Sequence, residues 1–317
     1  MNHLRKWAAV AFFVGLCSTE IHAQWTIAFQ ERSKRDLNGV FFIDQNRGWI
    51  IGDNGIIHAT QNGGAEWTSL NPRVSTNLSD VFFRNQTEGW LIASGAQILK
   101  TQDAGETWEF VYQIQLAPGK RKEDAPELYS LSFPNNKKGW VVGTDGRILH
   151  TEDGGRSWAN QESGTAEELV HVKFLNDKRG WTVGGGGTVL FTDDGGRTWE
   201  LQASGTTKHL YHIEAQGKNN AWIVGDDGTL LRTTNAGLTW EKVALTTKQS
   251  LINAAFANDR QGWAVGWKGT ILRTEDGGQT WVEQESGTRE NLYGVSVKKN
   301  KVWAVGAEGL VLRYEIR

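Results

Sequence analysis

The chain has 317 residues, a formal net charge of −2 at pH 7 and one cysteine. This slightly acidic balance argues against nucleic-acid binding, which usually needs a basic domain. One cysteine cannot form a disulfide framework, but a chain of this length can bury a large core without disulfides.

Residues 1–23 have the parts of a secretory signal peptide. Arg5 and Lys6 precede an apolar run that ends at Cys17, and a polar stretch then ends at Ala23. The apolar run is too short to cross a bilayer. We expect cleavage after Ala23 and export to the periplasm, the thylakoid lumen or the medium. The mature chain would then have no transmembrane segment.

Two tryptophans separated by 18 residues recur six times along the chain. The first of each pair are Trp49, Trp90, Trp140, Trp181, Trp222 and Trp263, and the second are Trp67, Trp108, Trp158, Trp199, Trp240 and Trp281. Successive units are offset by 41 residues, except for one step of 50 between the second and third units. A fixed period of about 40 to 45 residues is typical of β-propeller blades.

Each unit has the pattern of four short strands. In the fourth unit we predict strands at 169–174, 180–184 and 188–192, and a last strand within 194–201. These segments are rich in Val, Phe, Trp and Thr and are separated by Gly, Asn and Asp turns, as in consecutive hairpins. The apolar residues show no helical period, so we expect an all-β fold.

The two ends of the chain predict how the ring closes. A seventh unit begins at Leu292 and stops after 310–313 without a last strand, while the strand 24–29 stands alone at the N-terminus. Trp25 precedes Trp49 by 24 residues, close to the 23 between Trp67 and Trp90, so this strand is in phase to complete the last blade. Closure would remove an exposed sheet edge. We therefore predict one domain, residues 24–317, that forms a seven-bladed β-propeller.

The last hairpin of each unit carries the Asp-box motif, Thr-x-Asp-x-Gly-x-Thr-Trp, which is also the bacterial neuraminidase (BNR) repeat. The acidic or amide position is occupied by Asn62, Asp103, Asp153, Asp194, Asn235 and Asp276. Its side chain can accept backbone N–H bonds within the turn, glycine allows a positive φ, and tryptophan packs between sheets. Turn chemistry explains every position, so we interpret these residues as structural.

Whole units resemble the repeat of the photosystem II stability and assembly factor family. The segment 139–158, Gly-Trp-Val-Val-Gly-Thr-Asp-Gly-Arg-Ile-Leu-His-Thr-Glu-Asp-Gly-Gly-Arg-Ser-Trp, carries its blocks, and the resemblance covers residues 25–317. It implies an exported seven-bladed propeller that binds partner proteins and is not an enzyme. The partner would be a protein, such as the exported face of an integral membrane protein. We expect a monomer without cofactor.

A sialidase-like glycosidase or a carbohydrate-binding propeller is the alternative, because such proteins share Asp boxes. The chain lacks the Arg-Ile-Pro type segment that a sialidase would have near its N-terminus. A sialidase also needs an arginine triad and a tyrosine paired with a carboxylate. The loops that enter the inner strands contain Arg35, Arg73, Arg289, Tyr129, Tyr211 and Tyr293, with Glu127 and Glu290 close in sequence to two of the tyrosines.

Other polar clusters do not predict a cofactor or a metal. The run Gly184–Gly187 lacks the Lys-Ser or Lys-Thr of a P-loop. Asp226, Asp227 and the Asp boxes lack the alternating ligands of a calcium loop. His171, His209 and His212 have no third-ligand pattern, and we expect them to line the channel.

Two surfaces are candidates for binding a partner. The turns between the first and second strands carry a set of cations that we call the basic rim, consisting of Arg47, Lys137, Lys138, Lys178, Arg179, Lys218, Arg260, Lys298, Lys299 and Lys301. Acidic residues of the Asp-box loops would neutralise part of it, so a merely solvated face remains the alternative. On the opposite face, the array's single insertion, 113–126, carries Lys120, Arg121 and Lys122. Loops on a rigid ring often carry specificity.

Overall fold

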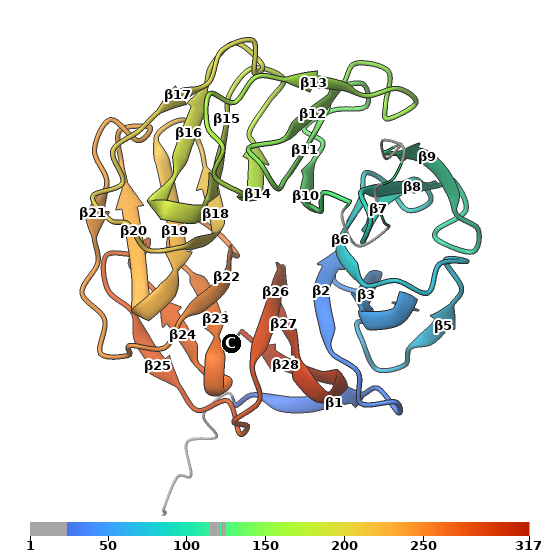
Figure 1. Ribbon diagram of the computed structural model, residues 1–317. Coiled ribbons are helices and arrows are strands. Elements are labelled where there is room, and N and C mark those ends of the chain that lie inside the picture. Colours follow the sequence, from blue (N-terminus) through green and yellow to red (C-terminus); the bar gives the residue numbers. More distant parts are fainter. Residues whose placement is uncertain (1–23, 115–118, 120, 122–124, 317) are drawn as a thin grey trace, which may run out of the picture.

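The fold is a ring of seven four-stranded antiparallel sheets, shown in Figure 1. The computed structural model describes residues 24–114, 119, 121 and 125–316. The predicted all-β, seven-bladed β-propeller is confirmed. The predicted signal peptide, residues 1–23, lies outside the described residues. Within those residues, no helix is long and apolar enough to cross a membrane.

Each blade places its first strand at the channel and its later strands progressively outward (Figure 1). Blades 1 to 3 consist of β2 (Leu37–Phe42), β3 (Gly48–Gly52), β4 (Ile57–Thr60) and β5 (Thr68–Leu70); β6 (Leu78–Phe83), β7 (Gly89–Ala93), β8 (Gln97–Thr101) and β9 (Glu109–Gln113); and β10 (Leu128–Ser132), β11 (Gly139–Gly143), β12 (Ile148–Thr151) and β13 (Ala159–Gln161). Blades 4 and 5 consist of β14 (Leu169–Phe174), β15 (Gly180–Gly184), β16 (Val189–Thr192) and β17 (Glu200–Leu201); and β18 (Leu210–Gln216), β19 (Asn220–Gly225), β20 (Thr229–Thr233) and β21 (Glu241–Lys242). Blades 6 and 7 consist of β22 (Leu251–Phe256), β23 (Gly262–Gly266), β24 (Ile271–Thr274) and β25 (Val282–Gln284); and β26 (Leu292–Lys298), β27 (Lys301–Gly306), β28 (Leu310–Glu315) and β1 (Thr26–Gln30).

Short 3₁₀ turns join the second and third strands of most blades. They are η1 (Asp53–Gly55), η3 (Gly185–Gly187), η4 (Asp226–Gly228), η5 (Trp267–Gly269) and η6 (Ala307–Gly309). The glycine run of the fourth unit is therefore such a turn, as its sequence suggested. A Cβ on Gly184 would lie 1.8 Å from the carbonyl oxygen of Glu168, so the close approach of the two chains there requires glycine.

The first tryptophan of each unit is buried between blades, and so is Trp303 of the seventh unit. Most of these rings stack on a phenylalanine from the inner strand of the following blade. The rings of Trp49 and Phe83 are parallel, with centroids 3.5 Å apart, and those of Trp303 and Phe42 repeat this geometry. Aromatic pairs of this kind contribute beyond the area they bury. The repeat spacing thus reflects one inter-blade contact made again and again.

The N-terminal strand closes the ring as predicted. Strand β1 pairs antiparallel with β28, and Thr26 lies opposite Arg313. Trp25 is buried, its ring centroid lies 5.3 Å from that of Tyr314, and its Nε1 donates a hydrogen bond to Gln284 at 3.1 Å. Figure 1 shows β1 along the outer edge of β28. The first and last segments of the chain therefore form one blade.

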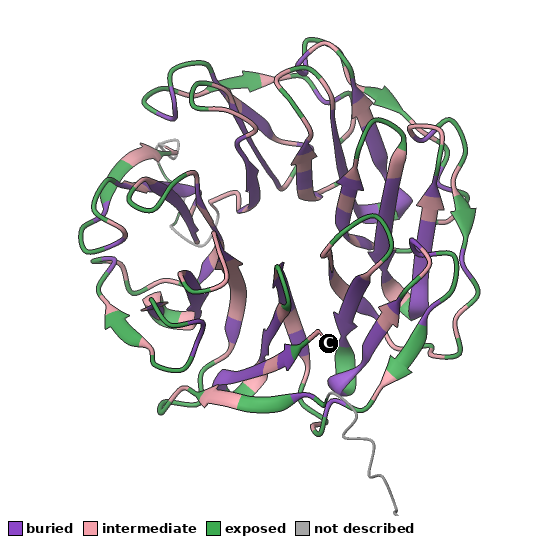
Figure 2. Cartoon of the chain, turned by 180° about the vertical axis from the view of Figure 1, so that it is seen from behind, coloured by how far each residue is buried: buried purple, intermediate pink, exposed green. Residues whose placement is uncertain are grey.

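The outermost strands are shorter than the sequence suggested. Residues 194–201 were expected to contain the last strand of the fourth unit, but only Glu200–Leu201 pair with the neighbouring strand. The preceding residues form the Asp-box loop, whose hydrogen bonds use the backbone groups that a strand would need. The outer strands are also the exposed ones, as Figure 2 shows.

Candidate partner-binding faces and the central channel

The ring has two chemically different faces. On the Asp-box face, the turn between the first and second strands of blades 1 to 6 lies beside an Asp-box loop. In blade 4, for example, the Gly195 N–H donates to the Lys178 carbonyl at 2.8 Å. On the 3₁₀ face, the turns between the second and third strands lie beside the connections between blades. There the Gly185 N–H donates to the Glu168 carbonyl at 3.0 Å.

The Asp-box loops are closed by the same few hydrogen bonds in each copy. In blade 4, the Thr192 hydroxyl donates to Asp194 at 2.9 Å and accepts from the Gly196 N–H at 2.9 Å. Asp194 also accepts the N–H and the hydroxyl of Thr198. Asn235 takes the same acceptor role toward Thr239 in blade 5. Asp103, Asp153 and Asp276 repeat the aspartate pattern, and Asn62 repeats the asparagine pattern.

We expect the aspartate loops to weaken in acid while the asparagine loops do not. Burial raises the pKa of Asp276, but hydrogen bonds from Thr280 and Thr274 outweigh it and lower that pKa to about 2. A depressed carboxyl pKa stabilises the fold above the unfolded value near 4, and this contribution is lost as the pH falls toward 2. Asp276→Asn should preserve the melting temperature at pH 7 and reduce its fall between pH 4 and 2. Asp276→Ala should cost about 1 kcal/mol at pH 7 through lost hydrogen bonds.

Thermal melts across this pH range, read by circular dichroism, would check this expectation. An Asp276→Asn variant with an unaltered acid profile would show that ionisation of this carboxyl does not stabilise the loop.

Five of the seven turns between the first and second strands are held by a side-chain acceptor at their start. The Asn176 Oδ1 accepts the N–H groups of Lys178 at 2.9 Å and of Arg179 at 3.0 Å. Asp44, Asn85, Asn135 and Asn258 do the same in their turns. Because the backbone is fixed in this way, the cations are presented from a rigid frame.

The residues of the basic rim differ in their solvent exposure and in whether their side chains contact other groups. Five of them are exposed, namely Lys137, Lys178, Lys218, Arg260 and Lys299. The Lys138 Nζ lies 3.7 Å from Glu152, whereas the guanidinium groups of Arg47 and Arg179 donate to backbone carbonyls of the next blade. Lys301 belongs to β27 and its Nζ lies 3.5 Å from the Gln45 carbonyl oxygen.

Lys298 departs from the expected ring of surface cations. It lines the channel and is half-buried, and burial together with Lys173 lowers its pKa. Arg84 is a rim cation that the sequence reasoning missed. Its guanidinium forms an ion pair with Glu88 and donates to the Asn136 carbonyl at 2.8 Å. Arg84 directly precedes the turn at residues 85–88. The turn itself contains no Lys or Arg, so the pattern of cations within the turns did not indicate Arg84.

The inserted loop is described only in part. The Ile114 N–H donates to the Ala96 carbonyl at 3.3 Å, which places the start of the loop on the 3₁₀ face. Arg121 is exposed, whereas Lys120 and Lys122 lie outside the described residues.

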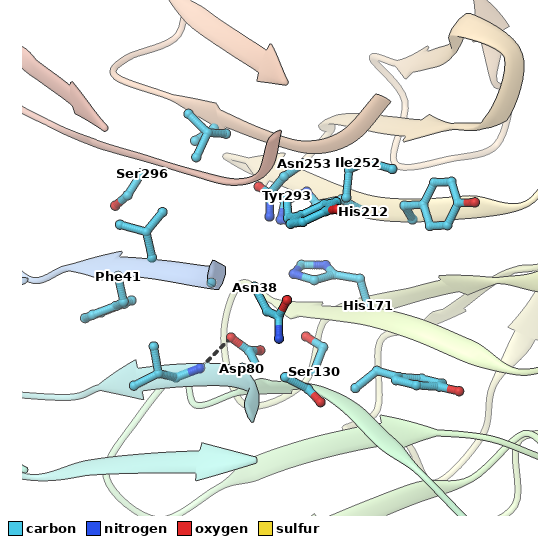
Figure 3. Close-up of a pocket in the computed structure, with 18 of the residues that line it drawn as sticks. Asn38, Phe41, Asp80, Ser130, His171, His212, Ile252, Asn253, Tyr293 and Ser296 are labelled. Carbon is cyan, nitrogen blue, oxygen red and sulfur yellow. Dashed lines mark hydrogen bonds between the residues drawn. The ribbon is translucent and has the colours of Figure 1, made fainter. Parts of the chain in front are cut away.

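The central channel forms a cavity of about 780 Å³ lined by the inner strands. Its polar side chains join neighbouring blades. Asp80 accepts the Leu131 N–H at 2.9 Å, and His171 Nδ1 accepts the Ile213 N–H at 3.4 Å. Ser130 and Ser132 do the same toward blade 4. Figure 3 shows Asp80, Ser130, His171 and His212 around the same space. These groups satisfy N–H donors at strand edges that have no further strand to pair with.

The three histidines do not gather at one place. His171 and His212 line the channel with ring centroids 3.8 Å apart. His209 does not line it, and its Nδ1 lies 3.6 Å from Glu168. Burial, with Lys173 nearby, lowers the pKa of His171 to about 3. Among the described residues, no group of three or more His, Cys, Asp or Glu side chains is arranged to hold a metal ion.

The three tyrosines hydrogen-bond to acids other than Glu127 and Glu290, which lie close to two of them in the sequence. The Tyr293 hydroxyl donates to Asp36 at 3.2 Å, and the Tyr211 hydroxyl donates to Asp226 at 3.0 Å. Tyr129 is hydrogen-bonded to Glu168. In the part of the chain that the structure describes, no arginine lines the channel cavity. The arginine triad of a sialidase site is thus not assembled there.

Several solved structures of other proteins share this architecture. YCF48 bound to D1 peptide is 22% identical with a TM-score of 0.74, and the match covers 92% of this chain and 97% of the other. YCF48 from Cyanidioschyzon merolae is also 22% identical, with a TM-score of 0.75 and coverage of 92% and 99%. Catalytically inactive virginiamycin B lyase from Staphylococcus aureus, with quinupristin, is 13% identical with a TM-score of 0.78 and coverage of 93% and 100%. These likenesses establish the fold alone.

A match to a family model shows the family to which the chain belongs. No curated protein matches the chain. The family model described as photosynthesis system II assembly factor YCF48 matches residues 66–164, 160–234 and 233–315. These three segments span more than half of the chain and run from the outer strand of blade 1 through blade 7, so the chain belongs to the photosystem II assembly factor YCF48 family.

Proposed function

We propose that this protein is an exported, non-enzymatic scaffold that binds a partner protein during assembly of a membrane complex, as photosystem II assembly factors do. The family match carries the proposal. A related structure described as YCF48 bound to D1 peptide supports a polypeptide as the ligand class. The channel supports a non-enzymatic role, because Asp80, Ser130 and His171 in its wall accept N–H groups of the next blade.

The basic rim is the partner surface that we favour. Its cations recur at the same place in successive blades, on turns whose backbone is fixed by hydrogen bonds. Within the described residues, Lys137, Lys178 and Lys299 are exposed and form no ion pair. Charges gathered on one face steer an acidic partner and set its orientation.

Charge reversal at the rim should weaken partner binding. Changing Lys137, Lys178, Arg179 and Arg260 to Glu should lower affinity for an acidic protein surface about tenfold at low salt and flatten its salt dependence. The fold should survive because all four residues lie in turns. Shortening the loop 113–126 serves as the matched change on the other face and should have less effect.

The experiment is a pull-down with the tagged mature protein from its native membranes, followed by titration of the recovered partner at several salt concentrations. Recovery of a chlorophyll-protein subunit that the reversed variant fails to retain would support the proposal. Normal binding by the reversed variant, with loss on shortening the loop, would assign specificity to the insertion. Turnover of a sialoside or oligosaccharide by the purified protein would overturn the non-enzymatic assignment.

A further inference from the structure

The fifth residues of the seven inner strands lie at one level of the ring, toward the Asp-box face. In blade order they are Phe41, Phe82, Ser132, Lys173, Glu214, Ala255 and Ser296. All but Phe82 and Ser132 line the channel cavity of about 780 Å³. Lys298, the last residue of β26, lines the same cavity. This end of the channel is therefore aromatic on blades 1 and 2 and charged on blades 4, 5 and 7.

Lys298 is a channel cation without a counterion. It is half-buried, and within the described part of the chain it forms no hydrogen bond or ion pair. Two carboxylates, Glu214 and Asp44, act on it only from a distance. Glu214 is already paired with Lys173 through both oxygens, at 2.9 and 3.0 Å, and Asp44 accepts the Arg47 N–H at 2.8 Å. Burial lowers the pKa of Lys298, as expected for an ammonium that has lost water and gained no partner.

Ser296 supplies a second donor beside Lys298. The two residues are separated by one position on β26, so their side chains lie on the same face of the strand. The Ser296 Oγ accepts the Phe42 N–H at 3.3 Å. Accepting this bond leaves the hydroxyl proton available to donate. An ammonium and a hydroxyl can therefore donate to one anion at this point of the wall.

Apolar side chains lie next to these two donors. The half-exposed ring of Phe41 lines the cavity, and its centroid lies 5.3 Å from that of Phe82 in an edge-to-face contact. Ala255 lines the cavity from blade 6. Figure 3 shows Phe41 and Ser296 at the same end of the channel, away from His171. Sites for small molecules typically combine such an apolar lining with a few fixed polar groups.

We propose that this end of the channel binds a small organic carboxylate with an apolar body, such as an arylalkanoate or a short fatty acid. The carboxylate accepts from the Lys298 ammonium and the Ser296 hydroxyl, and the apolar body packs against Phe41. Together, Lys173, Glu214 and Lys298 carry one net positive charge, which a single carboxylate balances. The site lies inside the ring and needs no partner protein, so it goes beyond the proposed function and does not depend on it.

The test is titration calorimetry of the mature protein with phenylbutyrate at low salt, compared with the neutral phenylbutyramide and with sulfate. Phenylbutyrate should bind at least about tenfold more tightly than either of the other two. Lys298→Met removes the ammonium but keeps a side chain of similar length, so it should weaken phenylbutyrate about tenfold, as expected for a lost charge-assisted contact. The control, Lys242→Met, removes the same charge from the exposed strand β21 and should bind normally.

A second variant tests the apolar half of the site. Phe41→Ala should also weaken phenylbutyrate, and melting curves would confirm that each variant folds. Absence of phenylbutyrate binding, equal binding of the amide, or equal affinity of Lys298→Met and Lys242→Met would overturn the site. Sulfate binding as tight as that of phenylbutyrate would overturn the ligand class. The comparison of acid with amide uses the unaltered protein, so it decides the question even if a variant is unstable.

Discussion

Removal of residues 24–30 should abolish the cooperative melt of the mature protein. Strand β1 is the outer strand of blade 7, so its loss exposes the edge of β28 and removes the buried ring of Trp25. Loss of a buried tryptophan alone costs about 3 to 5 kcal/mol, and an unpaired edge also promotes aggregation. We expect a broad transition and a polydisperse size distribution for the truncated chain.

The control for this deletion is Ile27→Ala. Ile27 belongs to the same strand but its side chain is 63% exposed, so this change should leave the melt intact. Calorimetry and light scattering would compare the two variants. A truncated chain with an unaltered melting temperature and a monodisperse size would show that β1 is not needed to close the ring.

Truncation of Trp181 to Ala should lower the free energy of unfolding by about 3 to 5 kcal/mol. Its side chain is fully buried, and its ring centroid lies 5.0 Å from that of Phe191. Trp199→Ala should cost less, because Trp199 is only half-buried at the blade edge. Chemical denaturation measures both values. The control is Trp267→Ala, since Trp267 is 42% exposed on a 3₁₀ turn.

Trp181 and Trp267 differ in burial, so comparing their alanine variants measures what burial of the ring contributes to stability. If Trp181→Ala and Trp267→Ala had equal effects, burial of the first tryptophan of the unit would not be a main source of stability. A Trp199→Ala protein that folds normally yet fails to bind a partner would instead make that residue part of a recognition surface.

The sequence was most informative where one physical contact repeats. The spacing of Trp49, Trp90 and their equivalents predicted the blades because each ring fills the same gap between neighbouring sheets. The phase of Trp25 predicted closure for the same reason. The last strand of the fourth unit was predicted to be too long. The Asp-box side chain accepts a backbone N–H group in this segment, and only its last two residues pair with the neighbouring strand.

The channel could not be predicted in the same way. Tyr129 was near Glu127 in the sequence, but it bonds Glu168 of the following blade. Asp80 reaches Leu131, 51 residues further along the chain. Such partners are set by ring geometry, and the residue type at these positions varies around the ring. Residue type alone therefore left open whether these groups were catalytic, ligating or structural.

The most direct test of the proposed function is site-specific photo-crosslinking of the mature protein in its native membranes. A photoreactive residue in place of Lys178 or Lys218 would report on the basic rim, and one in place of Arg121 would report on the inserted loop. The proposed function predicts crosslinks from positions 178 and 218 to one membrane-protein subunit, lost at high salt. Crosslinks from position 121 alone, or none from any position, would contradict it.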